Sequence, residues 1–231
     1  MKKMNIKIAI DGHSSCGKST MAKALAKHFG FVFVDTGAMY RSVTLFAIRN
    51  NMIDSNKNVD SQSLEQKIKS IRINFRKMDD GSLHTCLDGE DVEKEIRSMG
   101  VSSLVSTISA LKFVRQEMVN QQRKIAEETS VVMDGRDIGT VVFPNAELKI
   151  FVTARPEVRA QRRYDEMQAK GDTSVTFNEV LENLKQRDLQ DSTRAESPLK
   201  KADDAILLDN SDLTREQQFD MAVEMVEKII K

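Results

Sequence analysis

The sequence predicts an α/β protein in which a parallel sheet is covered by helices on both faces. Short apolar segments rich in β-branched residues recur along the chain, and longer segments with a helical spacing of apolar residues separate them. Strands buried on both faces have this character, and helical connections run neighbouring strands parallel. A glycine-rich loop also joins the first strand to the first helix. Ligands of such sheets bind at the carboxyl ends of the strands, so we expect the functional residues there.

Five core strands are predicted, at residues 6–11, 31–34, 130–134, 148–152 and 205–208. Helices are predicted at residues 18–29, 38–50, 101–110, 112–128, 156–169, 177–191 and 214–231. The first helix carries Met21, Leu25 and Phe29 four residues apart, and it stops at Gly30, a residue favoured just after a helix. Pro156 stands in the first turn of its helix, where its missing N–H costs nothing. Strands and helices thus alternate as a parallel sheet requires.

A different sequence pattern interrupts the predicted α/β core between residues 64 and 96. Residues 70–75 alternate polar and apolar side chains, a turn is predicted at 79–82, a strand at 83–87 and another turn at 88–89. This pattern indicates antiparallel strands joined by tight turns. The sequence therefore predicts a small β-containing insertion in the α/β core, preceded by a polar stretch at residues 51–62.

Composition and charge exclude several classes of protein. The chain has 231 residues, with 35 basic and 35 acidic side chains. A net charge near zero argues against a general nucleic-acid or membrane-surface binder. No apolar run approaches the ~20 residues that cross a bilayer, and the first residues do not resemble a secretory signal. Cys16 and Cys86 have no metal-binding spacing, and two thiols fit a reducing compartment, although they could pair. We expect a cytoplasmic globular protein.

The most informative local motif is the string GHSSCGKS at residues 12–19, which fits G-x-x-x-x-G-K-[ST] in full. A strand ends before it and a helix begins inside it, as this phosphate-binding loop requires. Glycines let backbone N–H groups turn toward phosphate oxygens, and the helix N-terminus adds its positive dipole end. Lys18 would neutralise the β- and γ-phosphates, and Ser19 offers a hydroxyl ligand to Mg²⁺. The motif predicts a P-loop NTPase fold.

The loop alone does not separate a kinase from a GTPase or a motor. A GTPase needs an N-K-x-D motif late in the fold, whereas the nearest string here, NKNVD at residues 56–60, is one residue too long and precedes the third core strand. Two other strings follow strand ends: DTGAMYR at residues 35–41 and DGRDIGT at residues 134–140. In the first, Thr36 could instead cap a helix. In the second, Arg136 and Asp137 could form a structural ion pair.

Together these strings resemble the bacterial-type cytidylate kinases, a family of nucleoside monophosphate kinases. The resemblance rests on DTGAMYR at residues 35–41, LDGEDV at 87–92, DGRDIGTVVFP at 134–144 and the pair Arg187-Asp188, and it extends from about Ile6 to the last helix. It implies an ATP:(d)CMP phosphotransferase that converts CMP or dCMP to CDP or dCDP with ADP as the second product. It also implies one kinase unit over residues 1–231, with a core (1–35, 129–154, 172–231), an acceptor lobe (36–128) and a lid (155–171).

The resemblance also implies which residues bind the two nucleotides. For ATP they are Gly12, His13, Ser14, Ser15, Cys16, Gly17, Lys18, Ser19, Thr20, Arg159 and Arg163; for CMP they are Thr36, Arg41, Ser106, Arg115, Arg136, Asp137, Arg187, Asp191 and Arg194. Arg41, Arg136 and Arg194 would hold the acceptor phosphate, since guanidinium groups match phosphate oxygens. Thr36, Ser106, Arg115 and Asp137 would recognise the base, and Arg187 with Asp191 the sugar. The family often has Ser at residue 36 and Pro or Ala at residue 13.

Each implied role has a plainer alternative. Ser106 could be an ordinary helix serine, and Arg187 with Asp191 a solvated ion pair four residues apart. Arg194 is expected just beyond the end of that helix. In the lid, Arg155, Arg159, Arg162 and Arg163 form a basic stripe that would close over ATP, with a hinge at residues 170–172, or would simply be an exposed charged face.

The expected chemistry needs little covalent help from the protein. Positioning and charge stabilisation dominate phosphoryl transfer, and a phosphate acceptor is already anionic, so no strong general base is required. Lys18, Arg136 and Arg194 are the expected catalytic residues. Mg²⁺ would be held by Ser19, with Asp35 acting through water. Closure of the lid and the acceptor lobe would exclude water, so ATP hydrolysis without CMP should be slow.

Two other functions stay open at this point. One is a kinase of the same fold acting on UMP, AMP or a small metabolite. The other is a P-loop module that senses a nucleotide without transferring phosphate, which a second anion site argues against. The expected partners are ATP, CMP and dCMP, with no nucleic acid and no membrane, and we expect a monomer.

Overall fold

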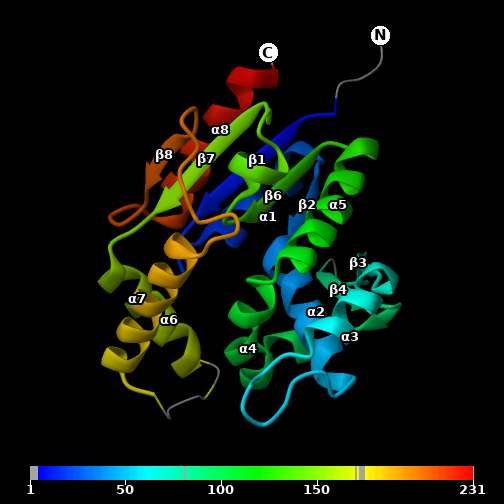
Figure 1. Cartoon of the computed structure of the whole chain (residues 1–231). Helices are drawn as coiled ribbons and strands as arrows, with labels where there is room; N and C mark the ends of the chain where they lie inside the picture. Colours follow the sequence, from blue (N-terminus) through cyan, green and yellow to red (C-terminus); the bar gives the residue numbers. More distant parts are fainter. Residues whose placement is uncertain (1–4, 81, 170, 172–174, 231) are drawn as a thin grey trace. The chain divides into compact units, whose positions relative to one another are not determined.

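A five-stranded sheet with the order β2-β6-β1-β7-β8 organises the first of the two units into which the chain divides (Figure 1). The computed structural model describes residues 5–80, 82–169, 171 and 175–230. The first unit comprises Met1–Phe33 and Ile125–Lys231, the second Val34–Lys124. The strands are β1 (Lys7–Gly12), β2 (Val32–Asp35), β6 (Val131–Gly135), β7 (Leu148–Thr153) and β8 (Ile206–Asp209). β1 runs parallel to β6 and β7, and β7 runs parallel to β8.

The inner strands are buried because their side chains are apolar on both faces. Ile8, Ile10 and Met133 are fully buried, as are most of their neighbours in β1 and β6. Helices α1 (Lys18–Phe29) and α8 (Arg215–Ile230) pack against each other and against strands of this sheet. α1 begins after Gly17 and ends at Gly30, both in the left-handed region. The predicted class, a parallel five-stranded sheet flanked by helices, is confirmed.

A helical pair forms a separate small core in the same unit. α6 (Pro156–Ala169) packs along α7 (Phe177–Thr193). Ala160, Val180 and Leu184 are buried between them, and the rings of Tyr164 and Phe177 meet edge to face. A capping box between Thr176 and Glu179 fixes the start of α7. The predicted hinge at residues 170–172 falls mostly outside the described residues, since only Gly171 is described there.

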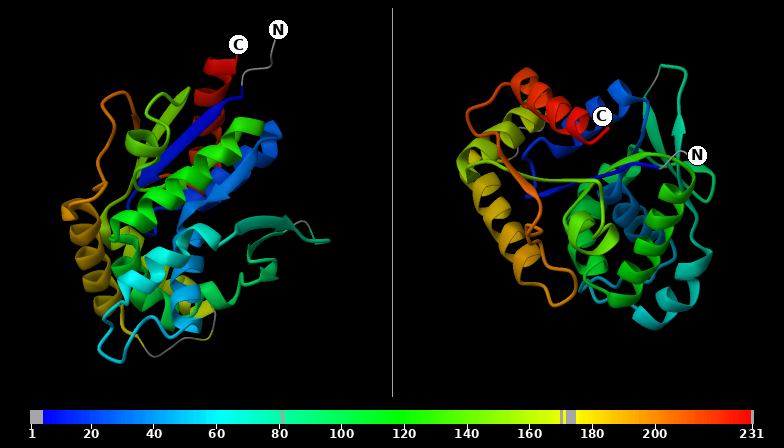
Figure 2. Two further views of the ribbon diagram at one scale, coloured as in Figure 1. Left: turned by 45° about the vertical axis from the view of Figure 1, so that its right-hand side comes forward. Right: turned by 90° about the horizontal axis from the view of Figure 1, so that it is seen from above.

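The second unit combines helices with a small sheet. Its helices are α2 (Thr36–Arg49), α3 (Ser61–Lys67), α4 (Met99–Ser109) and α5 (Lys112–Glu128), the last of which runs on into the first unit. Short 3₁₀ turns span Ile68–Ser70 and Glu95–Arg97. β3 (Ile73–Lys77), β4 (Leu83–Leu87) and β5 (Glu90–Asp91) form an antiparallel sheet, which Figure 2 shows as a ribbon extending from the helices of this unit.

Two local predictions in this unit were wrong, and one alternative is excluded. The start of the expected β insertion, residues 64–67, is helical, because Asp60 caps α3 through Ser63 N and buried Leu64 and Ile68 lie one helical turn apart. The first insertion strand begins at Ile73 rather than residue 70. Thr36 does not cap α2: Asp35 does, accepting a hydrogen bond from Ala38 N at 2.9 Å. The turn expected at 79–82 includes Gly81, which lies outside the described residues.

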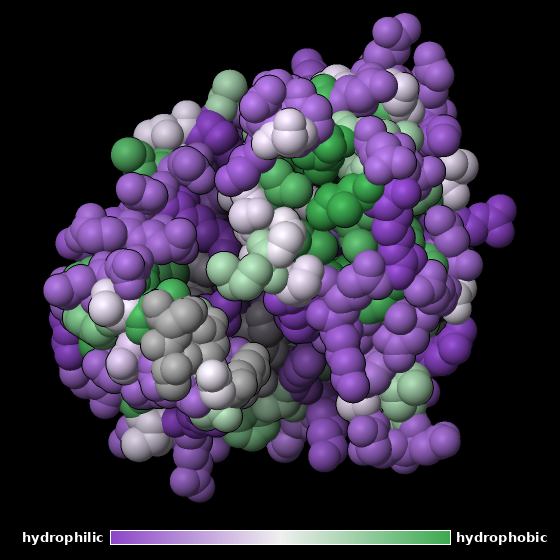
Figure 3. Space-filling model, turned by 90° about the horizontal axis from the view of Figure 1, so that it is seen from below, coloured by the Kyte–Doolittle hydropathy of each residue, from purple (hydrophilic) through white to green (hydrophobic). Residues whose placement is uncertain are grey.

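The face drawn in Figure 3 is mostly covered by polar side chains, with apolar side chains in smaller areas between them. Within the described ranges, none of the helices is long and apolar enough to cross a membrane. Cys16 and Cys86 are both buried free thiols, so the pairing left open by the sequence is absent. The division into core, acceptor lobe and lid stays a prediction.

Candidate active site

The glycine-rich loop follows β1 directly, at the carboxyl end of the sheet. Gly12 has φ 146°, and a Cβ atom on it would lie only 2.0 Å from the carbonyl oxygen of Val152 in β7. Only glycine therefore fits between β1 and β7. Gly17 has φ 81°, which turns the chain into α1. Both glycines of the motif are thus required by geometry, and the loop has the strand–loop–helix context that the sequence predicted.

Lys18 lies inside the curve of this loop. Its ammonium donates to His13 O at 2.6 Å, and the side chain is only 5% exposed. Burial and the positive charge of Arg136 lower the pKa of Lys18, and the carboxylates of Asp134 and Asp11 partly offset that change. An ammonium held against loop carbonyls, in a region with other cations, is suited to neutralising a polyanion.

The loop is anchored by a residue that the sequence analysis missed. Asn210, directly after β8, is fully buried and donates from Nδ2 to Cys16 O at 2.7 Å and to Gln218 Oε1 at 2.9 Å. Arg162 of α6 donates to Asn210 Oδ1 and to Asn210 O, each at 2.9 Å. A polar residue at the end of the last core strand was the available signal. Asn210 thereby connects the phosphate loop to α8 and α6.

Ser19 and Asp134 form the oxygen pair best suited to a divalent cation in the first unit. Ser19 Oγ donates to Asp134 Oδ2 at 2.5 Å, at the carboxyl end of β6. A hydroxyl next to a carboxylate, with a phosphate-binding loop beside them, fits the ligand preference of Mg²⁺, which combines few protein oxygens with water and phosphate. Among the described residues no group of three or more His, Cys, Asp or Glu could hold a metal, so a protein-only cage is absent there.

Asp35, the other expected metal residue, lies in the second unit and already has two partners there. It caps α2, and Arg97 Nη2 lies 3.4 Å from its Oδ2. Its role toward a metal stays untested, whereas Asp134, which the sequence analysis did not single out for a metal, contacts the loop serine directly.

A cluster of opposite charges follows β6. Arg136 donates from Nε to Asp191 Oδ2 of α7 at 2.8 Å, and Arg194 Nη1 lies 3.8 Å from Asp191 Oδ1. Burial raises the pKa of Asp191, but the charge and hydrogen bond of Arg136, with Arg187 and Arg194 nearby, hold it below its ordinary value. Arg194 is the residue just after α7, as predicted. Arg136 pairs with Asp191 of α7, and Asp137 beside it is buried.

The arginines of the predicted lid have different surroundings. Arg159 is 2% exposed and donates to Asp188 Oδ2 at 2.7 Å, to Ala154 O at 2.9 Å and to Ser14 O of the phosphate loop at 3.3 Å. Arg155 pairs with Asp212, and Arg163 pairs with Glu166 at 3.2 Å on the surface. Of the two arginines predicted to contact ATP, Arg159 reaches the loop and Arg163 faces outward beside Glu166.

His13 connects the loop to α7. Its Nδ1 lies 3.3 Å from Asp188 Oδ1, and its ring meets Phe151 edge to face with centroids 6.1 Å apart. Asp188 therefore contacts both His13 and Arg159 through its two oxygens. Burial raises the pKa of Asp188, but the hydrogen bonds from His13 and Arg159 outweigh burial and lower it. The side chain of His13 has a defined position in this unit, which the sequence did not indicate.

The remaining predicted acceptor residues lie in the second unit. Thr36 is buried at the start of α2, and Arg41 donates to Ser102 Oγ at 2.9 Å. Arg115 is buried, lies over the Tyr40 ring at 5.2 Å and donates to Ser109 O at 3.1 Å. Ser106 is half-buried in α4. Two buried or half-buried guanidinium groups in one unit fit an anion-binding role.

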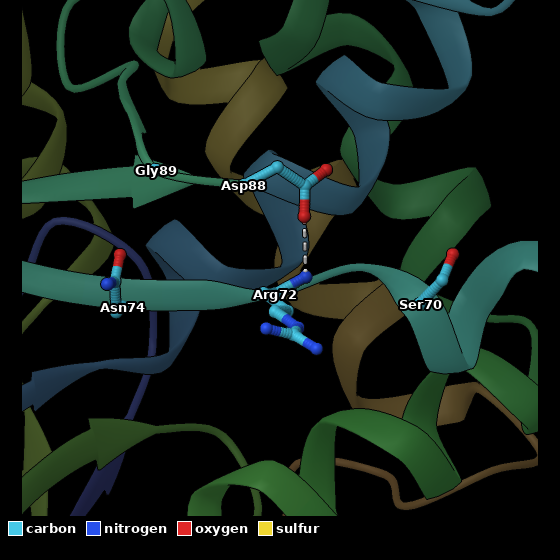
Figure 4. A pocket seen from close by; sticks show the side chains of 5 residues that line it. All are labelled: Ser70, Arg72, Asn74, Asp88 and Gly89. Atoms are coloured by element: carbon cyan, nitrogen blue, oxygen red, sulfur yellow. Dashed lines mark hydrogen bonds between the residues drawn. The ribbon is translucent and has the colours of Figure 1, made fainter.

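This unit also has a surface pocket of about 550 Å³ (Figure 4). Ser70, Arg72, Asn74, Asp88 and Gly89 line it, and Asp88 Oδ1 accepts a hydrogen bond from Arg72 N at 2.9 Å. All five residues are exposed, and none belongs to the predicted site. The pocket is an open hollow of the β3–β4 ribbon.

Comparisons with known proteins agree with this geometry. The family model described as cytidylate kinase matches residues 8–228. Cytidylate kinases of Bacteroides thetaiotaomicron and Flavobacterium johnsoniae are 57% and 50% identical to this chain, with at least 99% of each chain covered. An uncharacterised protein of Eubacterium ventriosum shares the fold, with a TM-score of 0.51 at 15% identity over 97% of this chain and 99% of its own. The match spans almost the whole length, and the chain belongs to the cytidylate kinase family.

Proposed function

We propose that this protein transfers the γ-phosphate of MgATP to CMP or dCMP, giving CDP or dCDP and ADP. The observation that supports it most is the pairing of two anion-adapted groups at the ends of neighbouring parallel strands. Lys18 and the loop follow β1, and the Arg136–Asp191–Arg194 cluster follows β6. A transfer between two phosphorylated substrates needs two such groups close together.

The donor side is assigned to the loop and its neighbours. Backbone N–H groups of residues 12–19 would surround the β- and γ-phosphates, and Lys18 would neutralise charge on the transferring group. Arg159 is held next to the loop by Asp188 and Ser14 O, so a small movement brings its guanidinium to a phosphate. We also propose that Arg163 contacts ATP, as the family resemblance implies.

The metal side is assigned to Ser19 and Asp134. Ser19 would bind Mg²⁺ through its hydroxyl, and Asp134 would accept hydrogen bonds from the water molecules around the ion. When bound, Mg²⁺ neutralises charge on the β- and γ-phosphates. The protein's own part is to hold the two oxygens at 2.5 Å from one another. Asp35 stays a second candidate for an indirect contact.

The acceptor side is assigned by chemistry. Arg41, Arg136 and Arg194 would hold the CMP phosphate, and Arg187 with Asp191 the sugar hydroxyls. Thr36, Ser106, Arg115 and Asp137 would recognise cytosine, whose exocyclic amine donates where uracil accepts. A carboxylate such as Asp137 can satisfy that amine, whereas uracil would leave a buried acceptor unpaired, which is costly.

The test is an ADP-release assay at saturating MgATP with CMP, dCMP, UMP and AMP side by side. We expect kcat/KM for CMP or dCMP to exceed that for UMP and AMP by about 100-fold or more. Equal turnover of UMP would favour a broader pyrimidine kinase. No ADP release with any monophosphate, combined with tight ATP binding, would favour a nucleotide-sensing module.

The proposal includes the setting in which the enzyme works. We infer a monomer in the cytoplasm whose partners are ATP, CMP and dCMP, and the near-zero net charge supports the expectation of no nucleic-acid partner. Sedimentation equilibrium at micromolar concentration should give a mass near 26.1 kDa. A mass of twice that value would overturn the monomer.

A further inference from the structure

Asp11 has an unusual position for a carboxylate. It is the residue before Gly12, at the end of the central strand β1, and it is only 5% exposed. Its Oδ1 accepts a hydrogen bond from Ile138 N at 2.8 Å, and its Oδ2 accepts one from Gly139 N at 2.7 Å. One carboxylate thus binds two successive backbone N–H groups of the segment after β6. Hydrogen bonds to an ionised acceptor are among the stronger ones in proteins.

Lys149 also lies against this segment. A Cβ atom on Gly139 would meet Lys149 Cδ at 3.1 Å and Asp11 Oδ2 at 3.3 Å, so both side chains pack close to the face of Gly139 where a Cβ atom would point. Lys149 is itself fixed, since its ammonium donates to Pro144 O at 2.5 Å and to both oxygens of Asp204 at 2.8 Å. Two side chains with fixed partners therefore pack against Gly139.

The clamped segment begins immediately after Arg136 and Asp137. It is a π-helical turn, Ile138–Val142, in which Val141 N and Val142 N both donate to Asp137 O, at 2.8 and 3.2 Å. A π turn is rare and frequently occurs at functional sites. Because Asp11 fixes the first two N–H groups of this turn, it also fixes the direction in which the two preceding side chains leave the sheet.

We propose that Asp11 is a positioning residue for the acceptor nucleotide: by holding Ile138 N and Gly139 N, it places Arg136 and Asp137 to receive CMP. This inference rests on the proposed function, which assigns Arg136 and Asp137 to the acceptor. Stability of the fold alone does not explain this carboxylate, because a buried charged group is seldom the most stable choice for a core position.

The test compares KM for CMP with KM for ATP in the full-length enzyme. Asp11→Asn keeps the shape but replaces one acceptor oxygen by an amide donor that opposes a backbone N–H. We expect KM for CMP to rise about 10- to 100-fold, as for loss of a charged hydrogen bond, while KM for ATP changes less than about 2-fold. Gly139→Ala adds a methyl group to the same turn without changing a residue of the phosphate loop. It should likewise raise KM for CMP and leave KM for ATP nearly unchanged.

Several results would overturn the inference. Unchanged KM for CMP in both variants, with only a lower Tm, makes Asp11 a residue of the fold. A rise in KM for ATP alone assigns it to the phosphate loop. If Asp11→Asn is not recovered folded, Gly139→Ala decides by the same criterion. Asp137→Asn in the same assay distinguishes failure of the proposed function from failure of this inference. An unchanged KM for CMP in Asp137→Asn overturns the proposed acceptor site. A raised KM for CMP in Asp137→Asn but not in Asp11→Asn overturns only the role of Asp11.

Discussion

At the scale of single residues, the site is built from charges that the fold keeps away from water. Asp11 is the clearest case. Burial raises its pKa to about 6, the negative charge of Asp137 adds to that rise, and the hydrogen bonds from Gly139 and Ile138 with the charge of Lys18 reduce it. The ionised form needed to accept two N–H groups is therefore costly near neutral pH.

Asp11 should leave a signature in the pH dependence of stability. Its folded pKa of about 6 lies above the ordinary 3.8, so the folded state binds the proton more tightly than the unfolded state between about pH 4 and 6. The stabilisation is fully present below about pH 4 and is lost as pH rises through about 6, a change of up to about 3 kcal/mol.

The measurement is urea denaturation of the wild-type protein and Asp11→Asn from pH 4 to pH 7. The free energy of unfolding of the wild-type protein should fall relative to that of the variant as pH rises across this window. Parallel curves for the two proteins would contradict the perturbed carboxyl.

Gly12 gives a second prediction at this scale. Gly12→Ala should destabilise the protein by about 3 kcal/mol or more, because backbone atoms of β7 occupy the place of the new Cβ. Gly89→Ala is the matched control, since Gly89 also has positive φ but has no atom within 4 Å of its Cβ position. It should cost about 1 kcal/mol. Thermal unfolding compares the two, and equal losses would exclude the close approach to β7 as the cause.

The sequence predicted some residues of the site but not their contacts. The glycine loop has a fixed spacing, so its lysine and serine are recognisable in the sequence. Asp11, Asp134 and Asn210 each stand at a strand end, but a strand end has no spacing that names a partner. Their contacts with Ile138, Ser19 and Cys16 span 127, 115 and 194 residues respectively, and only the folded sheet brings these residues together.

At the scale of elements, α7 connects the two halves of the chemistry in the first unit. Asp188 contacts His13 of the loop and Arg159 of α6, and three residues later Asp191 contacts Arg136 and Arg194. Residues three apart share a helix face. The same face of α7 therefore contacts both the phosphate loop and the Arg136–Arg194 cluster.

Asp188→Asn should affect ATP more than CMP. The change removes the charge that holds Arg159 and His13, leaving Arg159 buried with a weaker partner. We expect KM for ATP to rise about 5- to 20-fold and KM for CMP to change less than about 2-fold, measured by steady-state kinetics. The control on the same helix is Glu182→Gln, whose exposed pair with Lys185 should contribute almost nothing. An unchanged KM for ATP in Asp188→Asn would contradict the link to the loop.

Elements with strong periodicity were predictable, and those defined by tertiary contacts were not. The predicted ends of α1, α5 and α6 agree with the structure, because apolar spacing, Gly30 and Pro156 mark them. α3 has only seven residues and one fully buried side chain, Leu64, so its periodicity is too short to detect. β5 has two residues and exists only as a partner of β4.

At the scale of the whole molecule, the residues assigned to the acceptor are divided between the two units. Thr36, Arg41, Ser106 and Arg115 lie in Val34–Lys124, and the others lie in the first unit. Family resemblance joined them into one set, since no spacing in the sequence does so. The division into core, acceptor lobe and lid also came from the family resemblance and stays a prediction.

Single changes in either unit should therefore have the same kinetic signature. Arg41→Met and Arg136→Met should each raise KM for CMP by about 10-fold or more, with KM for ATP nearly constant, because each removes a cation assigned to the CMP phosphate. Arg72→Met, at an exposed position of the second unit in the pocket of Figure 4, is the matched control and should change neither constant. If only one of the two variants raised KM for CMP, the proposal that both arginines bind the same nucleotide would be contradicted.

The most direct test of phosphate transfer follows the γ-phosphate itself. ATP labelled in its γ-phosphate is mixed with Mg²⁺, CMP and the enzyme, and the products are separated. We predict that the label appears in CDP in equal amount to the ADP formed, and that little label is released as inorganic phosphate when CMP is omitted. Label that stays in ATP, or appears only as inorganic phosphate in the presence of CMP, would contradict the proposed transfer.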